Sequence, residues 1–150
     1  GIGKEYAVDR TLLLLKQHLE GLHMPAAGIL VNFGGDLCCT ARAYPAEPWK
    51  VGVEKQQQTG DATQVLPIQA GALATSGDTH RFLIRNGKRY SHVLDPQTGW
   101  PVEKAPHSVT MLAPTCTFAG MIATFAMLQG EQAEAFLEEQ DGIRYWIHNG

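Results

Sequence analysis

Short strand-like runs separated by turn residues fill the middle of the chain, and helical patterns lie towards its two ends. Alternating or continuous apolar runs predict strands at residues 26–33, 37–43, 49–54, 65–69, 71–75, 81–84, 88–94, 108–112 and 143–147. The Asn86-Gly87 pair is typical of a two-residue hairpin turn. A doubly wound sheet needs a regular alternation of strands and helices, which this order lacks. The sequence therefore predicts an α+β fold with a mainly antiparallel sheet and flanking helices.

Three segments have the apolar spacing of helices. The helix predicted at residues 4–22 has an apolar face formed by Val8, Leu12, Leu15, Leu19 and Leu22. Asp9 and Arg10 fall on its other side. Residues 116–129 are apolar almost all round, which predicts a buried helix capped by Thr115. Residues 131–140 form a third, amphipathic helix.

Length and charge narrow the classes of function. The chain has 150 residues, enough for one domain with a sizeable core. Its formal charge is -3 and it has no basic block, so we expect no nucleic-acid partner. No apolar run approaches the length that spans a bilayer. The chain opens on Gly1-Ile2-Gly3-Lys4 like the interior of a longer protein, so the lack of a targeting segment does not indicate a compartment.

The cysteines suggest neither a disulfide framework nor a zinc site. Cys38 and Cys39 are adjacent and should point to opposite faces of a strand, and Cys116 lies far along the chain. No CxxC motif or histidine spacing accompanies them. We expect all of them to be buried free thiols.

One loop has the character of a functional segment. The strand predicted to end at Leu94 runs into Asp95-Pro96 and then Thr98-Gly99-Trp100-Pro101. Pro96 fixes its own φ and moves Asp95 out of the helical region, and Gly99 can adopt a positive φ. These residues predict a rigid loop that presents His92 and Asp95, either as a site or as a well-made turn with a surface histidine.

Five segments in this order resemble the ApbE-type flavin transferases, the FAD:protein FMN transferase family. They are residues 1–9, the turn 32–36, residues 74–78, residues 90–99 with Pro101, and residues 113–115 with Ala123 and Thr124. The resemblance extends over residues 1–150 and covers the C-terminal half of that family's catalytic domain, so we expect the N-terminal half to be absent here. It implies transfer of FMN from FAD, through a phosphoester bond, to a Thr or Ser hydroxyl of a target protein. It also implies a need for Mg²⁺, and a bacterial periplasmic or membrane-anchored location.

The same resemblance implies roles for individual residues. His92 matches an active-site histidine that positions groups or transfers a proton near the phosphates. Mg²⁺ would be held by the Gly1 carbonyl and the Thr124 hydroxyl. The residues implied to contact FAD are Lys4, Ser76, Gly77, His92, Leu94 and Asp95, with Ser76-Gly77-Asp78 expected to form a turn.

Two departures from the family pattern leave the activity open. The family has an aspartate where this chain has Gly120, one helical turn before Thr124, so a metal carboxylate is missing. The family has glycine where this chain has Glu5. Glu5 is either a solvated first-turn glutamate or a speculative replacement metal ligand. The alternatives are an active flavin transferase, a flavin-binding module that has lost the transferase activity, and a structural domain.

Overall fold

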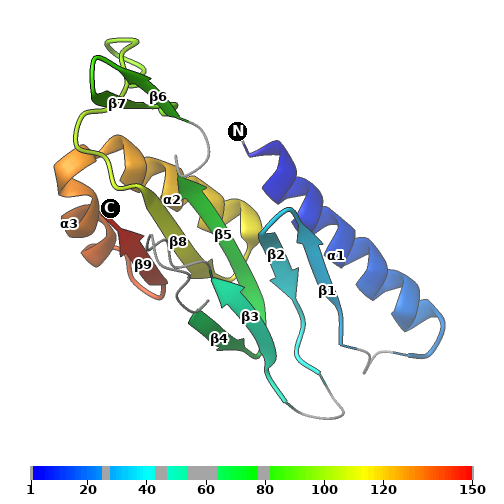
Figure 1. Cartoon of the computed structure of the whole chain (residues 1–150). Helices are drawn as coiled ribbons and strands as arrows, with labels where there is room; N and C mark the ends of the chain where they lie inside the picture. Colours follow the sequence, from blue (N-terminus) through cyan, green and yellow to red (C-terminus); the bar gives the residue numbers. More distant parts are fainter. Residues whose placement is uncertain (1, 25–27, 43–46, 54–63, 78–81, 150) are drawn as a thin grey trace.

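The computed structural model describes residues 2–24, 28–42, 47–53, 64–77 and 82–149. Within these ranges, the central feature is a five-stranded sheet with the strand order β1-β2-β5-β8-β9, in which all neighbours are antiparallel (Figure 1). Its strands are β1 (Leu30–Phe33), β2 (Asp36–Cys39), β5 (Gly71–Gly77), β8 (Ser108–Ala113) and β9 (Arg144–His148). The predicted α+β fold with a mainly antiparallel sheet is confirmed.

Two hairpins accompany the sheet. One pairs β3 (Trp49–Val53) with β4 (Gln64–Ile68), and the other pairs β6 (Phe82–Arg85) with β7 (Lys88–Ser91). The second hairpin turns at Asn86 and Gly87, whose φ angles are 53° and 74°. Two positive φ values are what a type I′ turn requires, so the predicted hairpin turn is confirmed.

Helices cover one face of the sheet, and the β3–β4 hairpin packs against the other. α1 (Gly3–Gly21) contacts β1 and β2, and α2 (Cys116–Leu128) contacts β5 and β8. A 3₁₀ turn, η1 (Gly130–Gln132), leads into α3 (Ala133–Glu138), which packs beside α2. The layers are therefore helices, sheet and hairpin, with the β6–β7 hairpin projecting from one end (Figure 1).

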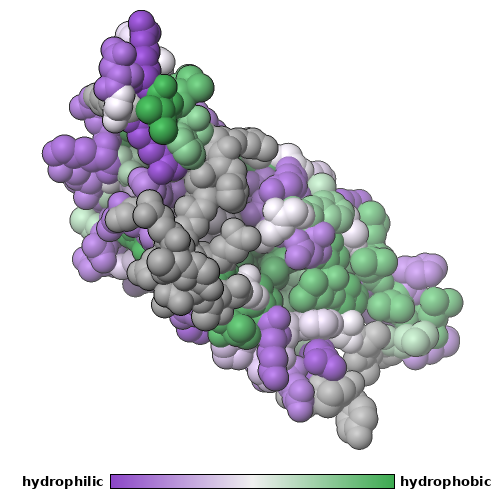
Figure 2. Space-filling model, viewed as in Figure 1, coloured by the Kyte–Doolittle hydropathy of each residue, from purple (hydrophilic) through white to green (hydrophobic). Residues whose placement is uncertain are grey.

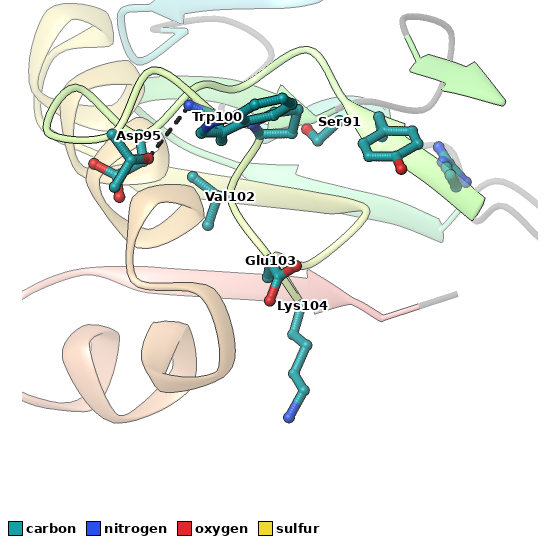
Figure 3. A pocket seen from close by; sticks show the side chains of 10 residues that line it. Ser91, Asp95, Trp100, Val102, Glu103 and Lys104 are labelled. Atoms are coloured by element: carbon teal, nitrogen blue, oxygen red, sulfur yellow. Dashed lines mark hydrogen bonds between the residues drawn. The ribbon is translucent and has the colours of Figure 1, made fainter. Parts of the chain in front are cut away.

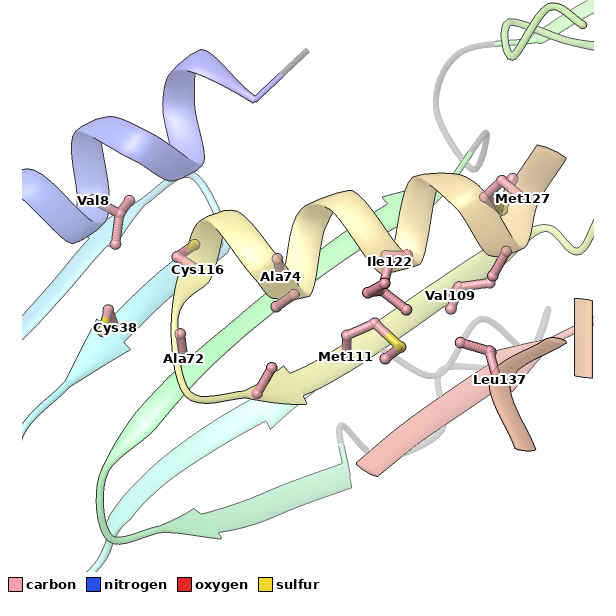
Figure 4. Packing of buried hydrophobic residues seen from close by; sticks show 14 of the residues in the cluster. Val8, Cys38, Ala72, Ala74, Val109, Met111, Cys116, Ile122, Met127 and Leu137 are labelled. Carbon is pink, nitrogen blue, oxygen red and sulfur yellow. The ribbon is translucent and has the colours of Figure 1, made fainter. Parts of the chain in front are cut away.

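Alternation along the strands produces two cores. On β5, Ala72 and Ala74 lie in the cluster beneath the helices, whereas Leu73 lies in the cluster beneath the β3–β4 hairpin. Val109 and Met111 of β8 face the helices in the same way (Figure 4). The small side chains of Ala72 and Ala74 allow α2 to lie close against β5, where the site described below is formed.

The cysteines follow the same alternation. Cys38 packs in the helix-side cluster and Cys39 in the hairpin-side cluster, which confirms the predicted opposite faces. Both are buried and free, as is Cys116 at the start of α2. Burial raises the pKa of the Cys38 thiol to about 12 and that of the Cys39 thiol to about 11. Burial also raises the pKa of Cys116.

Asp9 joins the first helix to the second. Its carboxylate accepts hydrogen bonds from the backbone N–H groups of Cys116 and Thr117, each at 2.8 Å, and from the Thr117 hydroxyl at 2.7 Å. Thr115 adds the expected cap by accepting from the Phe118 N–H at 3.2 Å. The prediction that Asp9 lies on the solvent side of its helix is wrong, because the orphan N–H groups of α2 draw the carboxylate inward.

The apolar face of α1 differs from the predicted one. Val8 is buried and Leu12 and Leu19 pack against the core, whereas Leu15 and Leu22 are exposed. Leu13 and Leu14 are exposed as well, and Figure 2 shows apolar atoms gathered where α1 and β1 lie. Helical spacing identifies residues that share a face, but it does not identify what covers that face.

The second helix is likewise less buried than predicted. Ala119, Ile122, Ala123 and Met127 face the sheet, whereas Phe118 and Phe125 are exposed on the outer side. α2 belongs to an outer layer, so only one side of it can meet the sheet.

Among the described residues, α1 and the shorter helices all lack the combination of length and apolar character that crossing a bilayer requires.

Two predicted boundaries near the candidate site are wrong. Ser76 and Gly77 were predicted to lie in a turn, but they are the last residues of β5 and pair with β8. The strand predicted to reach Leu94 ends at Ser91. Ladder pairing with β8 overrides the local turn tendency at Ser76 and Gly77. Asp78 and the polar loop predicted at residues 55–61 lie outside the described residues.

Replacement of Asp9 by alanine should destabilise the junction between α1 and α2. The Asp9→Ala variant loses three hydrogen bonds to an ionised acceptor, so we expect its free energy of unfolding to fall by about 2–3 kcal/mol. Urea denaturation measures this change. The exposed Asp141→Ala control should stay within about 0.5 kcal/mol of the parent. Equal losses in the two variants would contradict the proposed anchor.

The buried thiols should make stability fall in alkaline solution. Their folded pKa values are raised above the ordinary 9.0, so the unfolded chain releases these protons at lower pH than the folded chain. The thiol contribution to stability is present below about pH 9 and declines as the pH rises towards 11. Urea denaturation at a series of pH values tests this. A triple Cys→Ala variant should show a shallower decline, and an unchanged slope would refute the assignment.

Candidate functional site

An ion pair lies at the N-terminal end of α1. The Lys4 ammonium is 2.6 Å from Oδ2 of Asp36, whose side chain is only 5% exposed. Oδ1 of Asp36 accepts a hydrogen bond from the Thr75 N–H of β5 at 3.2 Å. The buried carboxylate therefore has a cation and a backbone donor as partners, which offset the cost of its burial. Through Asp36, the Lys4 side chain is fixed relative to β2 and β5.

A pair of hydroxyl groups connects the end of β5 to α2. Oγ1 of Thr124 donates to the Gly120 carbonyl at 2.8 Å and lies 2.9 Å from Oγ of Ser76. Since the single threonine proton is used for the carbonyl, Ser76 donates to Thr124. The next residue, Gly77, has no space for a side chain, because an added Cβ would lie 2.6 Å from Cβ of Ser108. Close packing of β5 on β8 thus places Ser76 against α2.

Glu5 contacts α2 at the one position that has no side chain. A Cβ built on Gly120 would lie 2.8 Å from Cγ of Glu5 and 2.9 Å from its Oε1. Glu5 is half-buried, and its Oε2 is buried without a hydrogen-bond partner among the described residues. The Glu5 side chain therefore fills the space that a side chain at position 120 would need.

The contacts of Glu5 with Gly120 and of Ser76 with Thr124 join α1 and β5 to α2 through carboxylate and hydroxyl oxygens, and the ion pair of Lys4 with Asp36 joins α1 to β2. Such oxygens are the ligands that hard cations such as Mg²⁺ prefer. Among the described residues, no group of three or more His, Cys, Asp and Glu side chains could hold a metal ion. A cation at this place would therefore depend on one carboxylate, on hydroxyl groups and on whatever a bound substrate supplies. Gly1, the other predicted metal residue, lies outside the described residues.

The loop after β7 forms a compact, internally bonded unit. The Asp95 N–H donates to the Trp100 carbonyl and the Gly99 N–H to the Asp95 carbonyl, both at 2.8 Å. Leu94 forms a β-bridge with Pro101, and Gly99 has the predicted positive φ, at 73°. The positive φ predicted for Gly99 is confirmed, and the rigidity of the loop stays a prediction. His92 is exposed at its start.

A hollow of about 780 Å³ lies between this loop and β7 (Figure 3). Its lining includes Arg89, Ser91, Asp95 and Trp100, but not His92. The contacts of Leu94 and Asp95 lie within the loop, whereas those of Lys4, Ser76 and Thr124 join the first helix, the sheet and the second helix. The contacts described for the predicted residues thus fall into two sets, one within the loop and one that joins α1, the sheet and α2.

Sequence reasoning missed two residues that hold this region in place. Asp36 was recognised only as part of a turn motif, and Asp9 only as a polar residue of a helix. Both are carboxylates whose partners lie far along the chain, at Thr75 and at Cys116 and Thr117. Nothing local in the sequence distinguishes such a carboxylate from a solvated one.

Comparison with known proteins gives a consistent set of matches. The sequence profile of the ApbE family matches residues 1–147. A protein named FAD:protein FMN transferase from Salmonella typhimurium is 34% identical over 147 residues, which are 97% of this chain and 40% of the relative. A protein of the same name from Haemophilus influenzae is 28% identical, over 97% of this chain and 41% of the relative. The chain thus spans about 40% of the length of these curated relatives.

Solved structures show the same likeness. The ApbE protein of Thermotoga maritima superposes with a TM-score of 0.80 at 31% identity, covering 97% of this chain and 46% of that one. The apo flavinyl transferase ApbE of Pseudomonas stutzeri superposes with a TM-score of 0.77 at 30% identity, covering 97% and 43%. The arrangement of helices and sheet described above is therefore shared with these proteins.

Asp36 and Lys4 should contribute unequally to stability. Asp36→Ala leaves a backbone donor of β5 unpaired in a buried place, so we expect a loss of about 2–3 kcal/mol in the free energy of unfolding. Lys4 is half-exposed, and water can replace part of its contact, so Lys4→Ala should cost about 1 kcal/mol or less. Denaturant unfolding of both variants tests the order. A larger loss for Lys4→Ala would show that the carboxylate is not the anchor.

Proposed function

The chain belongs to the ApbE family, and from this membership we propose that its protein transfers FMN from FAD, through a phosphoester bond, to a Thr or Ser hydroxyl of a target protein. Relatives named FAD:protein FMN transferase match 97% of the chain. The observations that carry the proposal lie where α1 meets β2 and α2: the ion pair of Lys4 with Asp36, the contact of Glu5 with Gly120, and the hydrogen bond between Ser76 of β5 and Thr124. That place combines a fixed cation with the oxygen ligands that a phosphate-bound metal ion requires.

The proposed reaction exchanges one phosphoester partner for another. The acceptor hydroxyl oxygen forms a bond to the phosphorus of FMN while the phosphoanhydride bond to AMP breaks. AMP leaves, and the hydroxyl proton passes to a base. In this proposal His92 positions the reacting groups or takes up that proton.

The other residues bind and orient FAD. The Lys4 ammonium offsets the charge of the pyrophosphate, and its ion pair with Asp36 holds it in place beforehand. Ser76, Gly77, Leu94 and Asp95 are assigned contacts with FAD, with Leu94 acting through its backbone. These assignments are supported by the family membership.

Mg²⁺ is part of the proposal, and the residues present fit it. Oε2 of Glu5 is buried and lacks a partner, and the Thr124 hydroxyl lies one helical turn beyond Gly120. Thr124 would hold the ion together with Gly1, whose role rests on the family resemblance. A bound Mg²⁺ would stabilise negative charge on the phosphoryl oxygens.

The alternative function is a flavin-binding module without activity. It was suggested by the absence of an aspartate at position 120, which implies a missing metal carboxylate. Glu5 presents a carboxylate to the same position, within 2.9 Å of where a Cβ on Gly120 would lie. This contact favours the enzyme over the binding module.

Two single variants of the full-length protein should separate binding from reaction. Lys4→Ala removes a charge that meets the pyrophosphate in the ground state, so we expect FAD to bind about tenfold more weakly. His92→Ala should leave affinity nearly unchanged and slow AMP release about a hundredfold. Flavin fluorescence titration measures the binding, and chromatographic detection of AMP together with in-gel fluorescence of the acceptor measures the reaction.

Lys16→Ala provides the matched control, because Lys16 is an exposed lysine of the same helix. It should bind FAD and release AMP like the parent protein. FAD binding without any AMP release, in the presence of Mg²⁺ and acceptor protein, would favour the binding module. Equal affinity of Lys4→Ala and the parent would remove the assigned role of Lys4.

A further inference from the structure

The Glu5 side chain occupies the space that a side chain at position 120 would fill. Glu5 comes from the first turn of α1, and Gly120 lies in the second turn of α2. A Cβ at position 120 would lie 2.8, 2.9 and 3.1 Å from three atoms of the Glu5 side chain. Distances under about 3.0 Å are closer than non-bonded carbon and oxygen atoms tolerate, so a side chain at position 120 excludes Glu5 from its present place.

Within the described part of the chain, the Glu5 carboxylate lacks a hydrogen-bond partner for one of its two oxygens. Its Oε2 is buried and has no hydrogen-bond partner among the described residues. The neighbouring cation, Lys4, is bonded to Asp36. A buried carboxylate oxygen without a donor is costly unless a cation balances it.

The surroundings of Glu5 fit a hard divalent cation. Thr124 follows Gly120 by one helical turn, so its hydroxyl lies on the helix face that Glu5 contacts. Ser76 adds a second hydroxyl at 2.9 Å from that of Thr124. Magnesium is commonly bound through one or two carboxylates, with water and substrate phosphates completing its octahedral shell.

We propose that Glu5 is the acidic ligand of a Mg²⁺ site at the junction of α1 and α2, and that Gly120 is the space that lets this carboxylate reach the site. The carboxylate that the family resemblance expects on α2 is thus supplied from α1. The Thr124 hydroxyl is the partner ligand, and the phosphates of FAD complete the site. This inference rests on the proposed function for the identity of those phosphates.

The competing explanation is a glutamate that stabilises only the helix. An acidic residue in a first turn interacts favourably with the helix dipole, and Glu5 is such a residue. That role is fulfilled by a carboxylate in water. It requires neither a buried Oε2 nor an empty position at Gly120.

Metal binding to the full-length protein without FAD provides the test. Mn²⁺, a probe that binds to oxygen ligands, is titrated and followed by its electron paramagnetic resonance signal. We expect Glu5→Gln to weaken Mn²⁺ binding at least tenfold, because an amide oxygen carries no charge. Glu20→Gln, at an exposed glutamate of the same helix, should bind Mn²⁺ like the parent. Equal Mn²⁺ affinity of Glu5→Gln and the parent would overturn the inference.

A reciprocal pair of variants tests the role of Gly120. Gly120→Asp alone should lower the melting temperature, because the new side chain collides with Glu5 and brings a second carboxylate beside it. The double variant Glu5→Gly/Gly120→Asp should regain both the melting temperature lost by the single variant and Mn²⁺ binding. A Gly120→Asp protein as stable as the double variant would contradict the exclusion between the two side chains.

Measurements of Mn²⁺ binding and of FAD cleavage distinguish a failure of this inference from a failure of the proposed function. If Mn²⁺ binding depends on Glu5 but FAD is not cleaved, the proposed function fails and the metal ligand stands. If FAD is cleaved and Glu5→Gln binds Mn²⁺ normally, the function stands and the inference fails.

Discussion

The carboxylate of Asp9 sets the relation between the two helices that build the candidate site. It accepts hydrogen bonds from the Cys116 and Thr117 N–H groups, and so ties the middle of α1 to the first turn of α2. Glu5 lies one turn before Asp9 on the same face of α1, and Gly120 lies one turn after the anchored residues. Because the helices are fixed at one point and run past each other in opposite senses, Glu5 is brought to Gly120. The contact between Glu5 and Gly120 is thus a consequence of a helix cap.

The strands of the sheet position the other residues of the candidate site. Ala72 and Ala74 of β5 let α2 lie close, and Gly77 lets the end of the strand lie flush against β8. Ser76 then meets Thr124, while Asp36 receives the Thr75 N–H and holds Lys4. The small residues in the layer beneath the helices therefore set the distance between the helices and the sheet. The polar residues at the edge of the sheet determine which groups of the helices and the sheet face one another.

The parts of the fold that were predictable from the sequence are those decided by nearby residues. The Asn86-Gly87 turn, the positive φ of Gly99 and the opposite faces of Cys38 and Cys39 depend only on local backbone chemistry and strand alternation. Ser76 and Gly77 were misassigned because their turn tendency competes with pairing to a strand far along the chain. The exposure of Leu15 and the anchoring role of Asp9 were also missed, since spacing within a helix contains no information about its neighbours.

The candidate site also has a feature that depends on contacts between distant residues, which the sequence alone does not reveal. In the sequence, Glu5 and Gly120 are two departures from a family pattern in different helices, and a solvated first-turn glutamate explains Glu5 as well as a replacement metal ligand does. In the structure they are one feature, because the two positions share a space that holds a single side chain. A side chain introduced at position 120 alone would displace Glu5, and removal of Glu5 alone would leave this contact without a carboxylate. The pair is therefore one structural unit, because a side chain at position 120 needs the space that the Glu5 side chain occupies.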